Sequence, residues 1–513
     1  MKAMAGFKAL AIVAGMAFAV TGCDNGDDGA TGPAGPEGPA GQDGQDGAGG
    51  ASAVSVAADR ITTMANDLRG LTYATVAPNA GKIYASGFVG MDEASRLGVV
   101  ARFNANGSPD TSFGDDGFVE LDVSAAQNEQ SLGVAELQSG DVVVTVQAAD
   151  DGGGQSVYLF RIAPDGTPAA GWGDADGKVE VAFGWANADN GDFPGAPAAF
   201  PSDTAWDVQT DKSVSGDRVV VFGLGSAGPN DASRTDNDRF VTRLDITATG
   251  AVPDATFNGG EPHTFHSTGT LGDNARRGLV EADGKIMSAG YTNLGEGLGN
   301  HVILIRLTNT GELDTTFGGF SSEPDLVAAA PGIVAFNPYK DDGGFAECYA
   351  ALPQSSGSFV TTGYGAATST GSVTGSSLGY ETTLAPDIVA FRVLAGTATD
   401  VDTSWGNTGQ LAVQSEGKGF PTSEDRGRHL VVLPDDRSIH VGRFGGVPAA
   451  VVMTADGQPD TSVFGDGIVE LTSDTVDSQF FGAALSADGK RVALSTNSNA
   501  NGARLVVLKV AAD

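Results

Sequence analysis

Short runs of apolar, often β-branched residues alternate with polar turns along most of the chain. The first complete unit shows this pattern, with a turn at Gly81, apolar runs at 82–86 and 99–103, and a second turn at Asn106-Gly107. Short apolar runs bounded by Gly, Asn and Asp are typical of β-strands joined as hairpins. The pattern therefore predicts an all-β chain.

The unit repeats from about Leu71 to the end of the chain, and seven copies are visible. Units this small cannot bury both faces of their strands alone, whereas stacking them radially buries those faces and leaves few exposed edges. We therefore expect a seven-bladed β-propeller, with six or eight blades as the alternatives. The first hairpin turn of the copies stands at Gly81, Gly140, Gly216, Gly284, Gly357, Asp436 and Gly489.

Two residue types recur late in each unit, an Arg at the end of a strand and an Asp in the closing element that follows it. Arg102 and Asp110 are eight residues apart, and Arg306 and Asp314 repeat this spacing. A catalytic group is needed once, but a pair that stabilises a blade is needed in every copy. We therefore expect a structural role, in which the Asp side chain locks a turn. Each closing element carries an aromatic residue, and the elements stand at 110–114, 170–173, 254–257, 314–318, 402–406 and 460–465.

The two residue types are not present in every copy. The second copy has Ala169 in the Asp position, and the sixth has Val452 in the Arg position. Such losses are easier to tolerate in a structural pair than in a catalytic site.

These motifs resemble the delta-60 repeat of bacterial exported proteins, whose usual form is Arg-Leu-Asn-x-Asp-Gly-x-Leu-Asp-x-Thr-Phe-Gly followed by a strand. The resemblance extends over the repeated part of the chain and is specific in the first, fourth and sixth copies. It implies a β-propeller in which each copy forms one four-stranded blade.

The seventh copy ends before its closing element and before the strand that follows this element in the other copies. Residues 53–56, Ala-Val-Ser-Val, precede the first copy at the place where such a strand is needed. We therefore expect an N-terminal strand to complete the last blade and close a propeller domain at residues 51–513.

Residues 1–22 have the features of a lipoprotein signal peptide. Lys2 and Lys8 are followed by an apolar run at 9–20 that is too short for a stable membrane span. The next residues, Thr-Gly-Cys23, complete a sequence that resembles a bacterial lipobox, which implies lipidation of Cys23. We therefore expect a lipoprotein anchored in a membrane of the cell envelope, on the periplasmic or cell-surface face. The alternative is an ordinary secretory signal with an incidental cysteine.

Residues 23–50 carry Gly at every third position from 26 to 50, which is the spacing of collagen. Acidic residues in this run would make three parallel chains repel one another. We therefore expect a disordered polar spacer on a monomer, with a trimer assembled through the stalk as the alternative.

The chain has 64 acidic and 29 basic residues and a net charge of −35. It has little basic surface to neutralise phosphates, so nucleic acid and anionic lipid headgroups are not expected partners. Acidity of this size keeps an exported protein soluble but names no ligand.

Candidate chemical groups are few. Cys348 and His440 lie in strand-like stretches and are expected to be buried. No catalytic residue or bound cofactor is predicted, since no nucleophile elbow or phosphate-binding glycine loop occurs in a suitable context.

Two segments suggest metal ligands. Asp174 starts a segment that resembles a calcium loop, but Trp185 stands where the loop needs Glu. His263 and His266 could lie close together, but they lack a third zinc ligand. Calcium bound by clustered surface carboxylates stays an open alternative.

Two classes of function fit the sequence. The favoured class is a non-catalytic binding or scaffold module whose long loops at 187–203, 226–238 and 366–386 contact an envelope protein or glycan. The alternative is an envelope enzyme, such as a glycan hydrolase or lyase or a quinone-dependent dehydrogenase. Such an enzyme requires charged or His residues from several blades to converge at one mouth of the channel. Only four Trp residues are present, which disfavours a platform for stacking sugars.

Overall fold

A computed structural model of the protein describes residues 54–511 apart from several short segments. The segments left out are 93–94, 124–127, 150–154, 182–202, 227–236, 266–271, 296–297, 325–326, 341–342, 367–385, 397–400, 407–409, 414–423, 472–477 and 498–501. Cys23, the expected signal peptide and the expected spacer lie outside the described residues, as do most residues of the three long loops.

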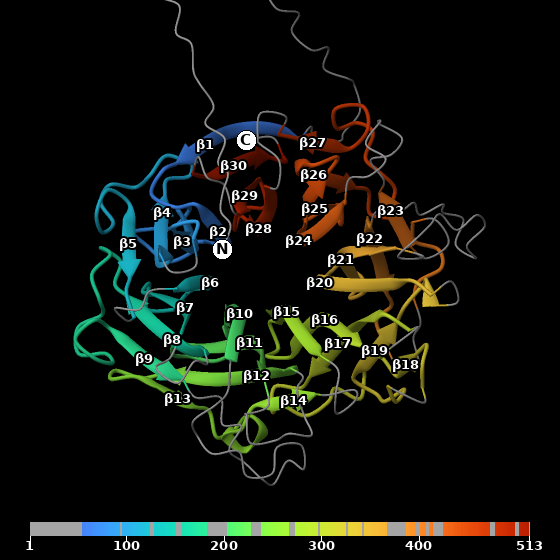
Figure 1. Ribbon diagram of the computed structural model, residues 1–513, viewed down its shortest axis with the longest axis horizontal. Helices are drawn as coiled ribbons and strands as arrows, with labels where there is room; N and C mark the ends of the chain where they lie inside the picture. The colour runs from blue at the N-terminus through green and yellow to red at the C-terminus, as the bar shows by residue number, and fades with distance from the viewer. Residues whose placement is uncertain are drawn as a thin grey trace, which may run out of the picture. The chain divides into compact units, whose positions relative to one another are not determined.

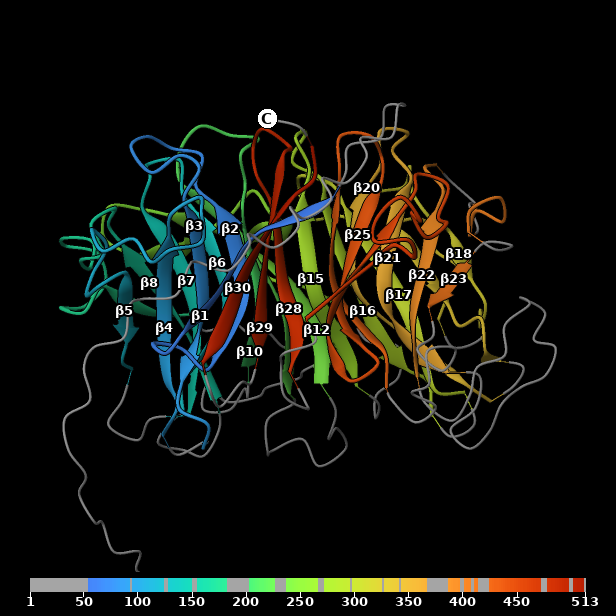
Figure 2. The ribbon, with the colours of Figure 1, turned by 90° about the horizontal axis from the view of Figure 1, so that it is seen from above.

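Seven β-sheets stand in a ring around a central channel (Figure 1). Viewed from the side, the long strands of the blades run between the two faces of the ring (Figure 2). The prediction of an all-β, seven-bladed propeller is confirmed. One short 3₁₀ turn, Asn258–Gly260, is the helical element of the described residues. Within these residues, no helix has the length and apolar character needed to cross a membrane.

Each blade is built outward from a strand beside the channel. The innermost strands are β2 (Asp67–Tyr73), β6 (Gln130–Glu136), β10 (Asp203–Thr210), β15 (Asp273–Val280), β20 (Phe345–Pro353), β24 (Arg426–Val432) and β28 (Gln479–Leu485). The second strands are β3 (Ile83–Val89), β7 (Val142–Ala149), β11 (Arg218–Ser226), β16 (Ile286–Asn293), β21 (Phe359–Ala366), β25 (Ser438–Phe444) and β29 (Arg491–Asn497).

The outer half of each blade follows in the same order. The third strands are β4 (Leu97–Phe103), β8 (Gln155–Ile162), β12 (Asn237–Ile246), β17 (Asn300–Leu307), β22 (Asp387–Val393), β26 (Val447–Met453) and β30 (Ala503–Lys509). The outer strands of the first six blades are β5 (Phe118–Leu121), β9 (Lys178–Val181), β13 (Ala251–Pro253) with β14 (His263–Phe265), β19 (Ile333–Phe336) with β18 (Phe320–Ser321), β23 (Gln410–Val413) and β27 (Ile468–Glu470).

The outer strand of the seventh blade comes from the other end of the described chain. β1 (Ser55–Thr62) pairs antiparallel with β30, with Ser55 opposite Lys509 and Thr62 opposite Ala503. The sheet therefore joins one N-terminal strand to three C-terminal strands. This strand begins two residues after the start of the expected segment at 53–56, overlaps its second half, and extends six residues beyond its end.

The core consists of apolar layers between neighbouring blades. One layer joins Leu68 and Ile83 of the first blade to Leu505 and Val507 of the seventh. Both faces of each blade are thus covered by the next blade, which explains why single repeats need the complete ring.

The closing elements anchor one aromatic side chain in each of five layers, and these residues are Phe113, Trp172, Phe257, Phe317 and Trp405. The sixth copy differs because its element is one residue longer. Val463 fills the buried position there, and Phe464 is 63% exposed with a positive φ of 48°. The aromatic residue of the sixth element is therefore present but does not join the apolar layer.

The recurrent Arg and Asp residues form ion pairs that hold the closing turns. Arg102 Nε lies 2.6 Å from Asp110 Oδ2, and Ser112 Oγ donates to Asp110 Oδ1 at 2.7 Å. Burial opposes ionisation of Asp110. Hydrogen bonds from Lys82, Ser112 and Arg102 outweigh burial and hold the pKa of this carboxyl well below its usual range. Equivalent pairs are Arg243–Asp254 at 2.7 Å, Arg306–Asp314 at 3.3 Å and Arg392–Asp402 at 2.6 Å.

The two copies that lack one partner obtain it from the first hairpin of the same blade. In the second copy, Arg161 Nε lies 2.6 Å from Oδ2 of Asp141. In the sixth copy, Asp460 Oδ2 lies 3.2 Å from Nη1 of Arg437. The ion pair is thus retained while the positions of its residues change, as expected of a structural element.

Candidate functional site

Every inner strand contains a β-bulge, and the bulges lie at corresponding positions around the ring. A bulge inserts one extra residue and re-aims its side chain, which is why bulges recur beside binding sites. We call these seven residues the bulge ring. They are Arg69, Leu132, Trp206, Arg276, Tyr349, Arg428 and Phe481, one from each blade in order.

Cations and aromatic rings alternate around most of the bulge ring. The guanidinium carbon of Arg276 lies 4.2 Å from the ring centroid of Trp206 and 5.2 Å from that of Tyr349. Arg428 lies 4.6 Å from Tyr349 and 5.7 Å from Phe481. Arg69 is 5.0 Å from Phe481. These distances fall within the range of cation–π attraction. The contacts therefore link each blade to the next from the third blade through the seventh and on to the first.

Polar contacts fix the three arginines differently. Arg69 is ion-paired, with its Nε 2.9 Å from Oδ1 of Asp67. Arg428 Nε donates to Gln479 Oε1 at 2.8 Å, and Arg276 Nη2 donates to Tyr291 Oη at 2.7 Å. Among the described residues, no carboxylate oxygen lies within 4 Å of Arg276 or Arg428. Arg276 Nε and Trp206 Nε1 are buried and meet no described acceptor.

A further arginine crosses the channel beside the bulge ring. Arg277 of the fourth blade donates from Nη2 to the main-chain oxygens of Arg69 and Phe481, both at 2.9 Å, in the first and seventh blades. Its Nη1 lies 3.9 Å from Asp207 Oδ1. A buried side chain therefore occupies the channel at this level and braces opposite sides of the ring.

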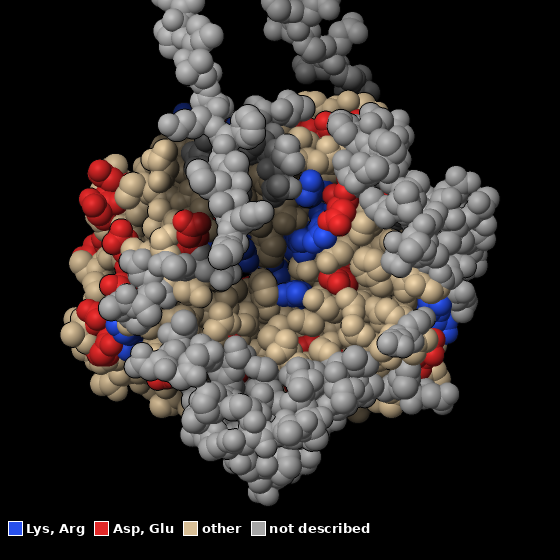
Figure 3. Space-filling model, in the orientation of Figure 1, with Lys and Arg blue, Asp and Glu red and all other residues tan. Residues whose placement is uncertain are grey.

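The bulge ring lies near the face where the inner strands begin. Figure 3 shows a hollow at the centre of the ring, with Lys and Arg surface beside it and Asp and Glu surface next to these cations. Because second strands run antiparallel to inner strands, they end at the face where the inner strands begin. The four longest segments left out of the description are 182–202, 227–236, 367–385 and 414–423. Each of them is bordered by a strand that ends or begins at that face.

Charged residues from several blades therefore converge, as the enzyme alternative requires, but their environment favours binding. His429 follows Arg428, and its Nδ1 accepts a hydrogen bond from the main-chain N–H of Ala483 at 2.9 Å. Burial, together with the charge of Arg277, lowers the pKa of His429 well below its usual value. A histidine held neutral in this way is a poor proton carrier at neutral pH.

Cys348 and His440 are both buried, in agreement with the expectation for each. Cys348 is 1% exposed, and burial raises the pKa of its thiol to about 12. His440 is fully buried with Nε2 2.8 Å from Ser438 Oγ, and burial lowers its pKa to about 3. Neither residue is prepared for chemistry at neutral pH.

The candidate metal ligands are not brought together in the described part of the chain. Lys178 Nζ lies 3.6 Å from Asp174 and 3.1 Å from Asp176, so an internal cation already neutralises this acidic turn. His263 lies on β14, and its suggested partner His266 lies outside the described residues. No group of three or more His, Cys, Asp or Glu side chains suited to a metal ion occurs among the described residues. Calcium binding stays a prediction.

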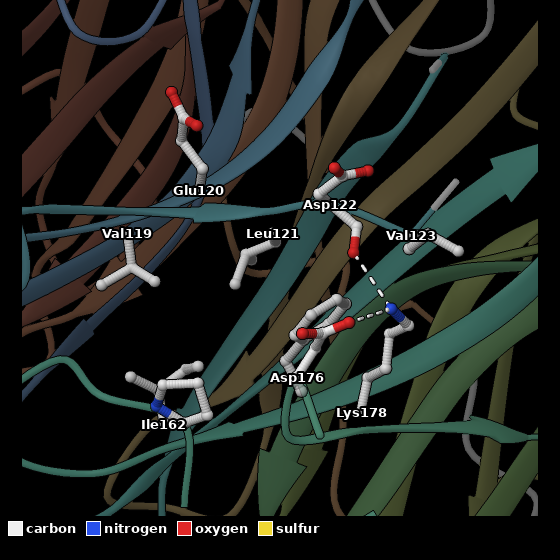
Figure 4. A pocket seen from close by; sticks show the side chains of 10 residues that line it. Val119, Glu120, Leu121, Asp122, Val123, Ile162, Asp176 and Lys178 are labelled. Atoms are coloured by element: carbon white, nitrogen blue, oxygen red, sulfur yellow. Dashed lines mark hydrogen bonds and ion pairs between the residues drawn. The ribbon is translucent and has the colours of Figure 1, made fainter. Parts of the chain in front are cut away.

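A separate pocket of about 330 Å³ lies between the outer parts of the first and second blades (Figure 4). Its floor is apolar, and Figure 4 shows Glu120 pointing away from it. Lys178 at the rim is held by Asp176 and by the main-chain oxygen of Asp122 at 3.1 and 3.3 Å. Because its one cation is already bonded, the pocket is a weaker candidate than the bulge ring.

The fold and the bulge ring define a seven-bladed β-propeller with a cationic, aromatic mouth. Residues 81–113 and 281–317 match a family described as a domain of unknown function (DUF5122) beta-propeller. Each segment runs from near the first hairpin turn to the aromatic residue of the closing element, in the first and fourth copies. The match makes these segments similar to that family, and no curated protein matches the chain.

Many solved structures match the chain. The Dos1 propeller is 8% identical, with 90% of this chain and 96% of that chain covered and a TM-score of 0.42. A protein of unknown function from Dyadobacter fermentans is 12% identical, with 89% and 99% covered and a TM-score of 0.38. Prolyl oligopeptidase B from Galerina marginata is 10% identical, with 84% and 48% covered and a TM-score of 0.40. Likeness at this level carries no functional information.

Proposed function

We propose that this β-propeller is a non-catalytic binding module of the bacterial cell envelope, anchored through lipid on Cys23. Its ligand, an envelope protein or glycan, engages the face where the inner strands begin. The observation that carries the proposal is the bulge ring, in which the inner strand of each of the seven blades has one bulged residue at a corresponding position and six of these residues are linked by cation–π contacts. Support for the anchor is the lipobox-like sequence that ends at Cys23.

The chemistry of the bulge ring suits recognition rather than turnover. Guanidinium groups and aromatic rings bind ligands through charge, hydrogen bonds and stacking, and their protonation states do not change near neutral pH. The strands that border the longest loops end at the same face. Loops carried on a rigid scaffold commonly enlarge a binding surface of this kind.

A comparison of the two faces in cells tests the proposal. A photo-crosslinking amino acid replaces either Met91 or Asn106 in the full chain. Met91 follows β3 at the proposed binding face and is 44% exposed, whereas Asn106 is exposed in the turn after β4 at the opposite face. We expect a discrete crosslinked envelope product from position 91 and none from position 106. Equal labelling from both positions, or none from either, would contradict a specific binding face.

A further inference from the structure

The bulge ring contains two cations that have no ion pair within 4 Å among the described residues, in a protein with a net charge of −35. The recurrent structural arginines show the contrast, because Arg102, Arg243 and Arg392 each lie within 2.7 Å of a carboxylate oxygen. Arg276 and Arg428 have only neutral hydrogen-bond partners, Tyr291 and Gln479. Where acidic residues outnumber basic ones twofold, such arginines are available to an external anion.

The contacts around these arginines also hold them in place before a ligand arrives. Arg276 is packed between Trp206 and Tyr349, and Arg428 between Tyr349 and Phe481. Arg428 uses Nε for Gln479, which leaves both of its Nη atoms without a described acceptor. A guanidinium fixed by stacking loses little conformational entropy when it binds an oxyanion.

Two buried donors and one buried acceptor at this site lack partners among the described residues. They are Arg276 Nε, Trp206 Nε1 and Glu347 Oε2. Glu347 is 7% exposed, lies two residues before Tyr349 on β20, and interacts electrostatically with Arg276. Its other oxygen accepts a hydrogen bond from Asn300 Nδ2 at 2.7 Å. Unsatisfied buried polar atoms are costly, so a ligand that supplies both an acceptor and a donor would be stabilised here.

We infer that the bulge ring binds a hydroxylated carboxylate, the chemistry of a uronic acid, with the carboxylate on Arg276 and Arg428 and a hydroxyl on Glu347. This inference rests on the proposed binding function and names the ligand class of the same face. Trp206 is only partly buried, whereas Tyr349 and Phe481 are buried, so the exposed part of Trp206 supplies apolar surface for the C–H groups of a sugar. The carboxylate of Glu347 and the acidity of the whole protein disfavour a dianion such as phosphate.

Isothermal titration calorimetry on the full-length protein in detergent tests the inference. The probes are glucuronate, an oligomer of glucuronate, the corresponding neutral glucose oligomer and inorganic phosphate. We expect uronate to bind and the neutral oligomer and phosphate to fail. A free sugar acid as ligand predicts equal affinity for monomer and oligomer, whereas an acidic glycan predicts tighter binding of the oligomer.

Matched variants locate the site. Arg276→Gln and Arg428→Gln are each expected to weaken uronate binding at least tenfold, whereas Arg60→Gln, in the exposed strand β1, leaves it unchanged. Arg276→Lys keeps the positive charge but loses the planar guanidinium, so it is also expected to weaken uronate binding. Because this variant keeps the charge at the site, it serves as a second test if Arg276→Gln fails to fold. Equal melting temperatures establish that the variants are folded.

Three outcomes would overturn the inference: no binding of either uronate, phosphate binding as tight as uronate, or full binding by both Gln variants. Crosslinking from position 91 without uronate binding would refute the ligand class while leaving the binding face in place. Failure of both experiments would refute the proposed function as well.

Discussion

Arg437 and Asp460 show how a blade compensates for the loss of one side chain. The sixth copy has Val452 where other copies have Arg, and its cation comes instead from the residue after the first turn. In the fifth copy, that hairpin position holds Ser358, and the cation is Arg392 on the third strand. A cation on the third strand and a cation after the first turn can therefore each reach the Asp of the closing turn, and either one forms the ion pair that fixes this turn.

This convergence predicts a rescue within the sixth blade. Arg437→Ser leaves the nearly buried carboxylate of Asp460 without its cation, and breaking a buried pair costs about 3 kcal/mol or more of unfolding free energy. Adding Val452→Arg recreates the arrangement of the fifth blade and is expected to restore most of the loss. Chemical denaturation of the single and double variants measures both effects.

Asp176 supplies the control, because its carboxylate pairs with Lys178 but is 69% exposed. Asp176→Asn is expected to change stability by less than about 1 kcal/mol. A double variant no more stable than Arg437→Ser would contradict the equivalence of the two positions.

At the residue level, repetition made the structural pairs predictable, whereas the bulge ring could not be predicted. Asp110 recurs with its neighbours in other copies, so its role as a turn residue followed from the sequence alone. Arg69, Arg276 and Arg428 share no motif with Trp206 or Tyr349. Their common position depends on a one-residue shift in strand register, which alternation of polar and apolar residues does not reveal.

β1 is the element on which closure of the ring depends. It forms seven paired positions with β30, and most of its side chains are exposed. The need for this strand was predictable because the last copy lacks an outer strand. Its bounds were not, because an exposed outer strand has little apolar pattern to mark where it begins and ends.

Removal of residues 1–62 is therefore expected to destabilise the propeller. If each lost main-chain hydrogen bond contributes about 1 kcal/mol, the loss is about 5 kcal/mol or more. Thermal melting followed by circular dichroism measures the effect. A chain that lacks only residues 1–50 retains β1 and serves as the matched control. Identical melting curves for the two shortened chains would show that β1 does not close the ring.

At the scale of the whole molecule, acidic residues dominate the chain, while many of its arginines lie in ion pairs or beside the channel. The sequence established the excess of acid but not this distribution. Arg277, for example, lies on the fourth blade, and its hydrogen-bond acceptors lie 204 and 208 positions away in the chain. Contacts at such separations arise only when the ring closes, so composition alone could not place cations at the channel.

The predicted attachment to a membrane also concerns the whole molecule, and Cys23 is its expected origin. Cys23→Ser removes the thiol that a lipid would modify, so we expect the full chain to move from the membrane fraction to the soluble fraction. Fractionation of cells followed by immunoblotting measures the shift. Cys348→Ser changes the other cysteine, which is buried, and is expected to leave the protein with the membrane. Retention of the Cys23→Ser chain in the membrane fraction would refute the lipid anchor.

In sequence, the predicted spacer at residues 23–50 comes shortly before the strand that closes the ring. Any mechanical load applied through the predicted spacer would therefore reach β1 before the rest of the propeller. Tension would act on the pairing of β1 with β30, and release of β1 would leave an open edge on the seventh blade. The predicted anchor would thus be joined to the propeller through the same eight-residue strand that closes the ring, so the pairing of β1 with β30 is the first contact that tension would break.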